Sequence, residues 1–493
     1  MRPSLFALCF VANASVALSQ STAHDATSHT HDKPTLGTIS FPNGGGKSAQ
    51  EPFLRGVALL HNFEYDRAAQ AFRQAQTADP SFALAYWLEA LTYSHVVWRT
   101  EDLSRSRAVL AKLGVTPSQR LARATSPMDR AFGAAVEAFY VDRPLEQRAS
   151  AYADSMRHIV SRWPDDQEAA AFASHALMVK GVLNNPGAVR DSLSRDAIAL
   201  SLRVFKNNQK HPGATHYLIH LYDEPNMARE GLEFARLYDT IAPDAEHALH
   251  MPSHIYLQLG MWADVVSSNE RSWAASRRAG TPSWHALSWL QYAYLQQGRW
   301  EAGRALIDSA RAVVPTDRDE GYIDALAIIP RLQFQYAAAS SRWTHPISEP
   351  PAPRSGAMQD RERGFRLSAG YWRAVDAAQR NEATLGTTAA PFISRADSAR
   401  AGTLGSSIQG ANALLVEALV SRARGDTAGY MSKLEAAAER ERQITPFVGP
   451  PERLFALEVL GDELTARGKF DEAARAFEQV LRVTPGRSES LFG

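Results

Sequence analysis

Two pairs of histidines recur along this chain with the same spacing inside each pair and the same shift between the pairs. His216 and His220 lie four residues apart, and His250 and His254 repeat that spacing 34 residues later. Residues four apart share one face of an α-helix, and self-similarity at a fixed period of roughly 20–50 residues is typical of stacked repeats. The pattern therefore constrains the chain to an array of similar helical units that present equivalent positions side by side.

The composition favours helices and argues against some partners. Lysine plus arginine equals aspartate plus glutamate, at 53 each, so no net charge would attract nucleic acid or an anionic membrane. Ala, Leu, Arg and Glu are abundant, whereas the alternation typical of strands is hard to find. We expect an all-α fold without a nucleic-acid partner.

Residues 1–19 have the pattern of a signal peptide. Arg2 precedes an apolar run, and small side chains at its end favour cleavage near Ser19. The run is short for a membrane span, and no later segment approaches the ~20 apolar residues that a span needs. Cys9, the only cysteine, lies inside this segment, so the mature chain would have no thiol or disulfide chemistry. We expect an exported protein, periplasmic or secreted, with no transmembrane anchor in the mature chain.

Residues 20–48 are rich in Ser, Thr, His, Gly and Pro, which is typical of a solvated, disordered leader. The segment Gly44–Ser48 looks like the end of a phosphate-binding loop. Phe41, however, stands where that motif requires its first glycine, and no strand precedes it. We interpret the segment as a linker.

The two ends of the remaining chain carry the clearest repeat motifs. Gly56, Ala68, Phe72 and Pro80 are spaced as in the tetratricopeptide repeat, and a second match lies near the C-terminus. The residues of that second match are Gly461, Gly468, Phe470, Ala473, Phe477 and Pro485. The chain thus resembles the tetratricopeptide repeat (TPR) family, and in particular uncharacterised exported bacterial proteins that contain such repeats.

Weaker matches connect the two ends. They divide the chain into an N-terminal array over residues 49–345, a Pro-rich connection over 346–365 and C-terminal repeats over 366–493. The resemblance implies a right-handed superhelix, an α-solenoid of helix pairs, because paired helices bury their apolar faces only against neighbouring pairs. In the family the first helix of each pair lines a concave surface that binds peptides or partner proteins.

The repeat register places most histidines on this concave surface. His216 and His250 occupy equivalent positions, as do His220 and His254. Further histidines and one tryptophan fall on groove-facing positions and are candidate ligand contacts: His61, His95, His247, His285 and Trp284. The resemblance therefore predicts a groove rich in His and aromatic side chains that takes a peptide, protein or envelope ligand.

The duplicated pairs also suggest a metal site. Zinc and copper bind neutral imidazole, and adjacent helices about 8–10 Å apart would bring side chains from both onto one ion. We expect His216, His220, His250 and His254 to supply four ligands. Acidic residues nearby are candidate accessory ligands or hydrogen-bond acceptors: Asp223, Glu224 and Glu246.

Two interpretations stay open at this point. The first is a binding scaffold with no cofactor, in which the histidines cap helices or contact the ligand. The second is a metal-binding protein or metalloenzyme that uses zinc or copper. The segment HMPSH lacks the glutamate of the HExxH protease motif and no other catalytic motif is present, so a non-enzymatic role is favoured. In either case clustered neutral imidazoles should lose their ligand as the pH falls through about 6.5.

Overall fold

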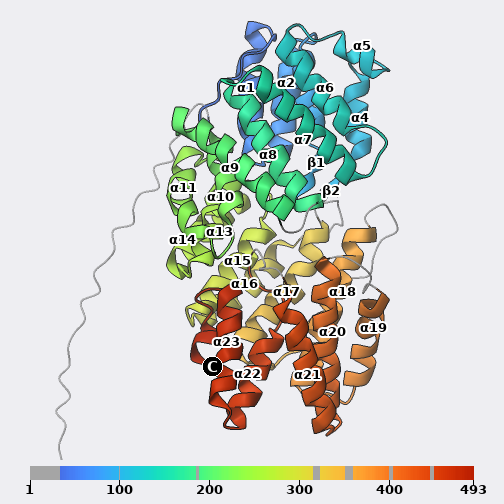
Figure 1. The fold of residues 1–493 in the computed structure, drawn as a ribbon, viewed down its shortest axis with the longest axis vertical. Coiled ribbons are helices and arrows are strands. Elements are labelled where there is room, and N and C mark those ends of the chain that lie inside the picture. Colours follow the sequence, from blue (N-terminus) through green and yellow to red (C-terminus); the bar gives the residue numbers. More distant parts are fainter. Residues whose placement is uncertain are drawn as a thin grey trace, which may run out of the picture. The chain divides into compact units, whose positions relative to one another are not determined.

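A computed structural model describes residues 34–98, 100–184, 188–314, 322–349, 359–398, 404–444 and 449–493. Antiparallel helical hairpins follow one another along the described chain, with one short β-hairpin between two of them (Figure 1). The all-α solenoid predicted from the sequence is confirmed. Residues 1–33 lie outside the described residues, and with them the predicted signal peptide and most of the leader.

The helices of the first half of the chain are α1 (Lys47–His61), α2 (Tyr65–Ala78), α3 (Ala83–Leu91), α4 (Leu103–Ala111), α5 (Pro117–Leu121), α6 (Pro127–Phe139), α7 (Leu145–Arg162), α8 (Gln167–Asn184), α9 (Ala188–Asn207), α10 (Pro212–Tyr222) and α11 (Ala228–Ile241). Strands β1 (Ser94–His95) and β2 (Thr100–Glu101) pair antiparallel between α3 and α4.

The second half continues with α12 (Glu246–His250), α13 (Pro252–Gln258), α14 (Trp262–Arg278), α15 (Trp284–Gln296), α16 (Trp300–Val313), α17 (Tyr322–Ser340), α18 (Gln359–Gln379), α19 (Leu385–Ser398), α20 (Leu404–Ala423), α21 (Thr427–Arg442), α22 (Ala456–Ala466), α23 (Phe470–Val483) and α24 (Ser488–Phe492). Residues 359–365, predicted as part of the Pro-rich connection, are thus helical, whereas residues 350–358 lie outside the described residues.

Glycines at the helix contacts let aromatic rings approach the neighbouring backbone. A Cβ atom on Gly56 of α1 would lie 2.7 Å from the Phe72 ring of α2, and one on Gly461 of α22 would lie 2.6 Å from the Phe477 ring of α23. These are the residues that carry the repeat motifs in the sequence, so the motifs mark close contacts between the two helices of a hairpin. Gly260 (φ 66°) takes the left-handed conformation at the turn between α13 and α14, as glycine readily does.

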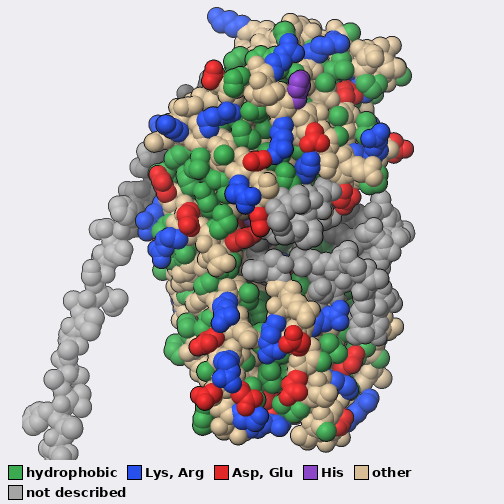
Figure 2. Space-filling model, viewed as in Figure 1, with side chains coloured by type: hydrophobic (Ala, Val, Ile, Leu, Met, Phe, Trp, Pro, Cys, Tyr) green, Lys and Arg blue, Asp and Glu red, His purple; other side chains and the backbone are tan. Residues whose placement is uncertain are grey.

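Residues Thr35–Gly493 form one compact unit. Its apolar core has three parts: the first extends from Leu36 to Leu332, the second from Phe334 to Leu419 and the third from Leu415 to Val480. On the face shown in Figure 2, basic and acidic side chains are interspersed, and very little histidine surface is visible. Within the described ranges, none of the helices combines the length and apolar composition that crossing a bilayer requires.

The end of the predicted leader is ordered, so that prediction was wrong for residues 35–46. Leu36 and Phe41 are buried, and the backbone N–H of Thr38 donates to the carbonyl of Lys210 at 2.8 Å. The Asn62 amide donates to the Leu36 carbonyl at 3.2 Å. These contacts join residues far apart in the sequence, which a local composition pattern cannot detect.

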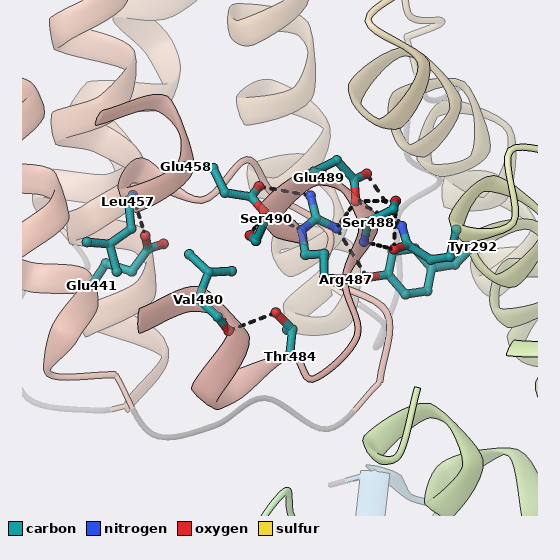
Figure 3. A network of polar contacts seen from close by, with 11 residues as sticks. Tyr292, Glu441, Leu457, Glu458, Val480, Thr484, Arg487, Ser488, Glu489 and Ser490 are labelled. Carbon is teal, nitrogen blue, oxygen red and sulfur yellow. Dashed lines mark hydrogen bonds and ion pairs between the residues drawn. The ribbon is translucent and has the colours of Figure 1, made fainter. Parts of the chain in front are cut away.

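The C-terminal residues bind back to the middle of the chain. The buried guanidinium of Arg487 donates to both carboxylate oxygens of Glu458, at 2.7 and 3.0 Å, and to the Tyr292 hydroxyl at 3.1 Å (Figure 3). The Trp262 indole N–H donates to the Gly486 carbonyl at 3.1 Å. The last hairpin is therefore connected to α14 and α15.

The contact at Gly56 predicts a difference between two glycine substitutions. Gly56→Ala should lower the free energy of unfolding by about 1–3 kcal/mol, because the new methyl group overlaps the Phe72 ring. Gly370→Ala, in α18, should raise it by about 0.5–1 kcal/mol, because its methyl group meets only ordinary contacts at 3.6 Å and alanine favours helix. Denaturant unfolding of both variants checks this. Equal effects would show that the glycine does not mark a close contact.

Candidate metal centre

Four helices bring six histidines together. His216 and His220 come from α10, His247 and His250 from α12, His254 from α13 and His285 from α15. We call these residues the six-histidine cluster. Pro252 lacks a backbone N–H and separates α12 from α13, but Met251 keeps right-handed helical angles. His250 and His254 therefore remain on successive turns, with ring centroids 5.0 Å apart.

The cluster consists of two adjoining trios. In the first, the rings of His216 and His220 lie 4.8 Å apart, and His216 and His247 5.0 Å apart. The second trio is His250, His254 and His285, with His250 and His285 4.6 Å apart. Within each trio the candidate ligand atoms lie within 4.8 Å of one another.

The trios touch where His220 meets His254, at 5.7 Å between centroids, and where His247 meets His250, at 6.0 Å. The sequence predicted one site from two histidine pairs. In the structure each pair instead gains a third member, His247 or His285, which had been predicted as a groove contact. The sequence indicated that these residues lie near the pairs, because the repeat register had placed His247 and His285 on groove-facing positions.

Hydrogen bonds to oxygen acceptors fix the tautomer of two of these rings. His61 is the last residue of α1, where carbonyl groups lack partners within the helix, and its carbonyl accepts from His216 Nδ1 at 2.7 Å. Asn269 Oδ1 accepts from His250 Nδ1 at 2.7 Å, while the Asn269 amide donates to the Val265 carbonyl, which sets the amide orientation. In both rings the proton is on Nδ1, so Nε2 carries a lone pair.

His254 is held in the same way by a carboxylate. Asp223 Oδ2 accepts from His254 Nδ1 at 2.6 Å, and Gln258 donates to the other oxygen of Asp223 at 3.0 Å. Asp223, predicted as an accessory ligand or acceptor, is thus an acceptor that orients His254. A carboxylate behind a histidine ring also raises the basicity of the opposite nitrogen.

In the second trio, the Nε2 atoms of the two oriented rings, His250 and His254, face each other. His250 Nε2 and His254 Nε2 lie 3.1 Å apart, although each ring already has its proton on Nδ1. Two nitrogens at this distance are held together by a shared proton or by a cation, because two bare lone pairs would repel each other. In the first trio, Nε2 of His216 and of His220 has no hydrogen-bond partner among the described residues. The cluster therefore offers places for a shared proton or a cation.

Burial favours the neutral form of most of these imidazoles. Removal from water lowers the pKa of His216, His247 and His250 well below the usual value, and neighbouring histidines lower it further. The same causes lower the pKa of His220 to about 3. Loss of a ligand through protonation should thus occur well below pH 6.5, the value expected from the sequence.

The other acidic candidates take different roles. Glu246 hydrogen-bonds to the hydroxyl of Ser272, and burial raises the pKa of this carboxyl to about 7. Glu224 lies in the wall of a cavity of about 380 Å³ that also contains His220, His254 and Asp223. Neither belongs to a metal-ligand group among the described residues, so the prediction of accessory ligation is not supported for them.

A third cluster, at His61, has all its hydrogen bonds satisfied. His61 is fully buried rather than groove-facing, so its prediction as a ligand contact was wrong. Its Nε2 lies 2.8 Å from Glu168 and its Nδ1 2.7 Å from the Tyr217 hydroxyl. His211 accepts from the Ala214 N–H through Nδ1, and its Nε2 lies 3.2 Å from Glu168. Burial alone would raise the pKa of Glu168, but His211 and His61 outweigh it and lower that pKa to about 2. His61, Glu168 and His211 also lie close enough together to form a metal-ligand group. Because their hydrogen bonds are already made within the chain, we interpret them as a structural network.

The remaining groove candidates line one cavity of about 480 Å³. Its wall includes His95, His247, Trp284 and His285. His95 stacks on Tyr65, with centroids 4.1 Å apart.

Trp289 is an aromatic neighbour of the cluster. Its ring lies 4.3 Å from that of His254 and 5.1 Å from that of His250. A Cβ atom on Gly449 would lie 2.9 Å from Trp289, so the C-terminal part of the chain supports this ring from behind.

Comparisons with known proteins add little to this picture. No protein-family model matches the chain, and no curated protein matches it. A solved structure of Naa15/Naa10 bound to HypK-THB aligns at 9% identity and a TM-score of 0.26, over 88% of this chain and 63% of that one. The TPR domain of P58(IPK) aligns at 12% identity and a TM-score of 0.20, over 88% of this chain and 99% of that one. The present chain thus spans less than two thirds of the length of the matched chain in the Naa15/Naa10 structure.

The hairpins and their glycine contacts define the class. The chain is an all-α solenoid of helical hairpins, as the sequence predicted, and its central hairpins enclose a cluster of six histidines.

The low histidine pKa values predict how stability depends on pH. His175 and His220 have pKa values of about 3 in the folded protein, mainly because they are buried, against about 6.5 in the unfolded chain. Below pH 6.5 the unfolded chain binds protons that the folded chain does not. The free energy of unfolding of the metal-free protein should therefore fall by about 2 kcal/mol per such histidine between pH 7.5 and 5.

Urea unfolding in the presence of a chelator, at several pH values, measures this slope. His175→Gln should reduce it, and His158→Ala, at an exposed position, should not. A slope that stays the same in His175→Gln would contradict the prediction.

Proposed function

We propose that this chain is an exported helical-repeat protein that binds transition-metal ions, zinc or copper, in the six-histidine cluster. The observation that carries the proposal is the contact between His250 Nε2 and His254 Nε2 at 3.1 Å. Both rings have their Nδ1 proton committed to an oxygen acceptor. A cation between the two Nε2 atoms would form a bond with each of them.

The distance also suits a metal ion. Two nitrogens bound to one tetrahedral zinc at about 2.0–2.1 Å each are separated by about 3.3 Å. Three of the candidate ligands are buried rings whose Nδ1 is held by an oxygen acceptor, and such orientation favours metal binding. The fully hydrogen-bonded group at His61 shows, by contrast, what a structural histidine cluster in the same protein looks like.

The carboxylates near the cluster favour binding over catalysis. Asp223 accepts a hydrogen bond from His254 and another from Gln258, so it is not positioned to take a proton from a water molecule. Zinc and copper both accept imidazole ligands, and the trio geometry fits either. The role that this arrangement supports is capture or storage of the ion, or its use as a contact point for a ligand.

Partner binding is a second candidate. It rests on the cavity of about 480 Å³ into which four of the five predicted groove residues project, namely His95, His247, Trp284 and His285. A peptide or protein segment bound there would contact the outer side of the metal centre. Export to the periplasm or the medium is part of the proposal and is supported by the signal-peptide pattern of residues 1–19.

Metal analysis of protein expressed without a His-tag tests the proposal. The wild type should contain about one or two zinc or copper ions per chain, because it has two trios. The double variant His216→Ala/His250→Ala removes one ligand from each trio and should lose most of the metal. His158→Ala serves as the matched control and should keep the wild-type content.

Trace metal in the wild type, unchanged in the double variant, would exclude the metal centre. If the double variant does not fold, the wild type can be stripped with a chelator and reloaded. Failure to take up either ion at micromolar concentration would then exclude the proposal equally.

The contact between Asp223 and His254 makes a separate prediction. Asp223→Asn should lower the metal affinity by about 10–100-fold. The amide orients the His254 ring less strongly than the carboxylate does, and it carries no negative charge. Competition with a chromophoric chelator measures the affinity. Glu230→Gln, an exposed substitution on α11, should leave it unchanged, and an equal loss in both variants would contradict a specific role for Asp223.

A further inference from the structure

The charge of the proposed metal centre is not balanced by its ligands. The two trios offer neutral imidazoles, whereas each bound ion would carry two positive charges. Asp223 contributes one negative charge, through His254. A buried net positive charge is costly unless it is paired. A centre of this kind therefore favours an additional anionic ligand from outside the chain.

Two cavities adjoin the cluster, and both have His247 and His285 in their walls. The cavity of about 380 Å³ also contains Asp223 and Glu224, whose charges oppose the entry of an anion. The cavity of about 480 Å³ contains Arg331 and its ion-pair partner Glu452, so these two charges balance. The charges thus favour the second cavity as the side from which an anion approaches, and we call it the Arg331 cavity.

Arg331 has one donor with no acceptor. Its Nη2 lies 3.0 Å from Glu452 Oε1, and its side chain is 19% exposed. Its Nε–H is buried and has no hydrogen-bond partner among the described residues. Arg331 is also close enough to His285 to help lower the pKa of that histidine. A guanidinium N–H left without an acceptor is unfavourable, and a bound oxyanion would satisfy it.

The other residues in the wall of the Arg331 cavity indicate what kind of ligand would fit. Trp284 and Phe365 provide flat apolar surfaces, and a volume of about 480 Å³ is within the usual range for small-molecule sites. A free inorganic anion would leave these walls without contacts. An organic acid would use them.

We propose that the Arg331 cavity binds a carboxylate with an apolar or aromatic body. One carboxylate oxygen completes the metal coordination beside His285, and the other accepts a hydrogen bond from the guanidinium of Arg331 in the cavity wall. The inference rests on the proposed metal centre. The carboxylate can come from a small organic acid or from the C-terminus of a peptide, since both present the same group.

Calorimetric titration of the zinc-loaded full chain tests this with a matched pair of probes. N-acetyl-phenylalanine has a free carboxylate, and N-acetyl-phenylalaninamide differs only in having an amide there. The acid should bind at least about tenfold more tightly, because a charge-assisted hydrogen bond and a metal bond are lost in the amide. Benzoate and the tripeptide Ala-Ala-Phe, compared in the same way, show whether a small acid or a peptide terminus is preferred.

A variant locates the site. Arg331→Gln should weaken binding of the acid by at least about tenfold and leave the metal content unchanged. Arg304→Gln, an exposed substitution on α16, should bind the acid as the wild type does.

The outcomes separate the two proposals. Equal affinity for the acid and the amide, with metal present, overturns the carboxylate site alone. Unchanged acid binding in Arg331→Gln does so as well. A wild-type protein that takes up no metal overturns the metal centre and, with it, this inference. If Arg331→Gln does not fold, the comparison of acid and amide on the wild type still decides.

Discussion

The hydrogen bonds at Nδ1 are the interactions on which the chemistry of this protein depends. Without them each imidazole could turn or exchange its proton between the two nitrogens, and the cluster would be an ordinary set of buried polar rings. With them, His216, His250 and His254 are restricted to one tautomer whose lone pair points into the cluster. The acceptors are a carbonyl at a helix end, an amide and a carboxylate, so unrelated parts of the chain produce the same result.

The repeat scaffold explains how these rings come together. Each hairpin presents its first helix beside that of the next hairpin, so equivalent positions on α10, α12–α13 and α15 become neighbours in space. The glycines that face Phe72 and Phe477 show how closely the helices of a hairpin approach. A chain that lacks cysteine beyond Cys9 must obtain this order from packing and hydrogen bonds.

The sequence predicted the repeated units and the pairing of histidines, because both are local patterns with helical spacing. His216 with His220 and His250 with His254 were visible as pairs for this reason. The carbonyl that orients His216 belongs to His61, 155 residues earlier in the chain. No local pattern reports such a contact, and the same is true of Trp289 behind His254 and of the ordered segment around Leu36. The burial of His61 was missed because its register position faces a groove in the family, whereas here Glu168 and Tyr217 enclose it.

The break at Pro252 affects more than the local helix. Repeat proteins flex because each hairpin can rotate slightly against the next, and the six-histidine cluster lies across three consecutive hairpins. His250 and His254 stand on either side of the interrupted turn, where the helix is easiest to bend. Ions held at this place, as proposed, would cross-link neighbouring repeats. Metal occupancy would then determine how far the central hairpins can rotate against one another.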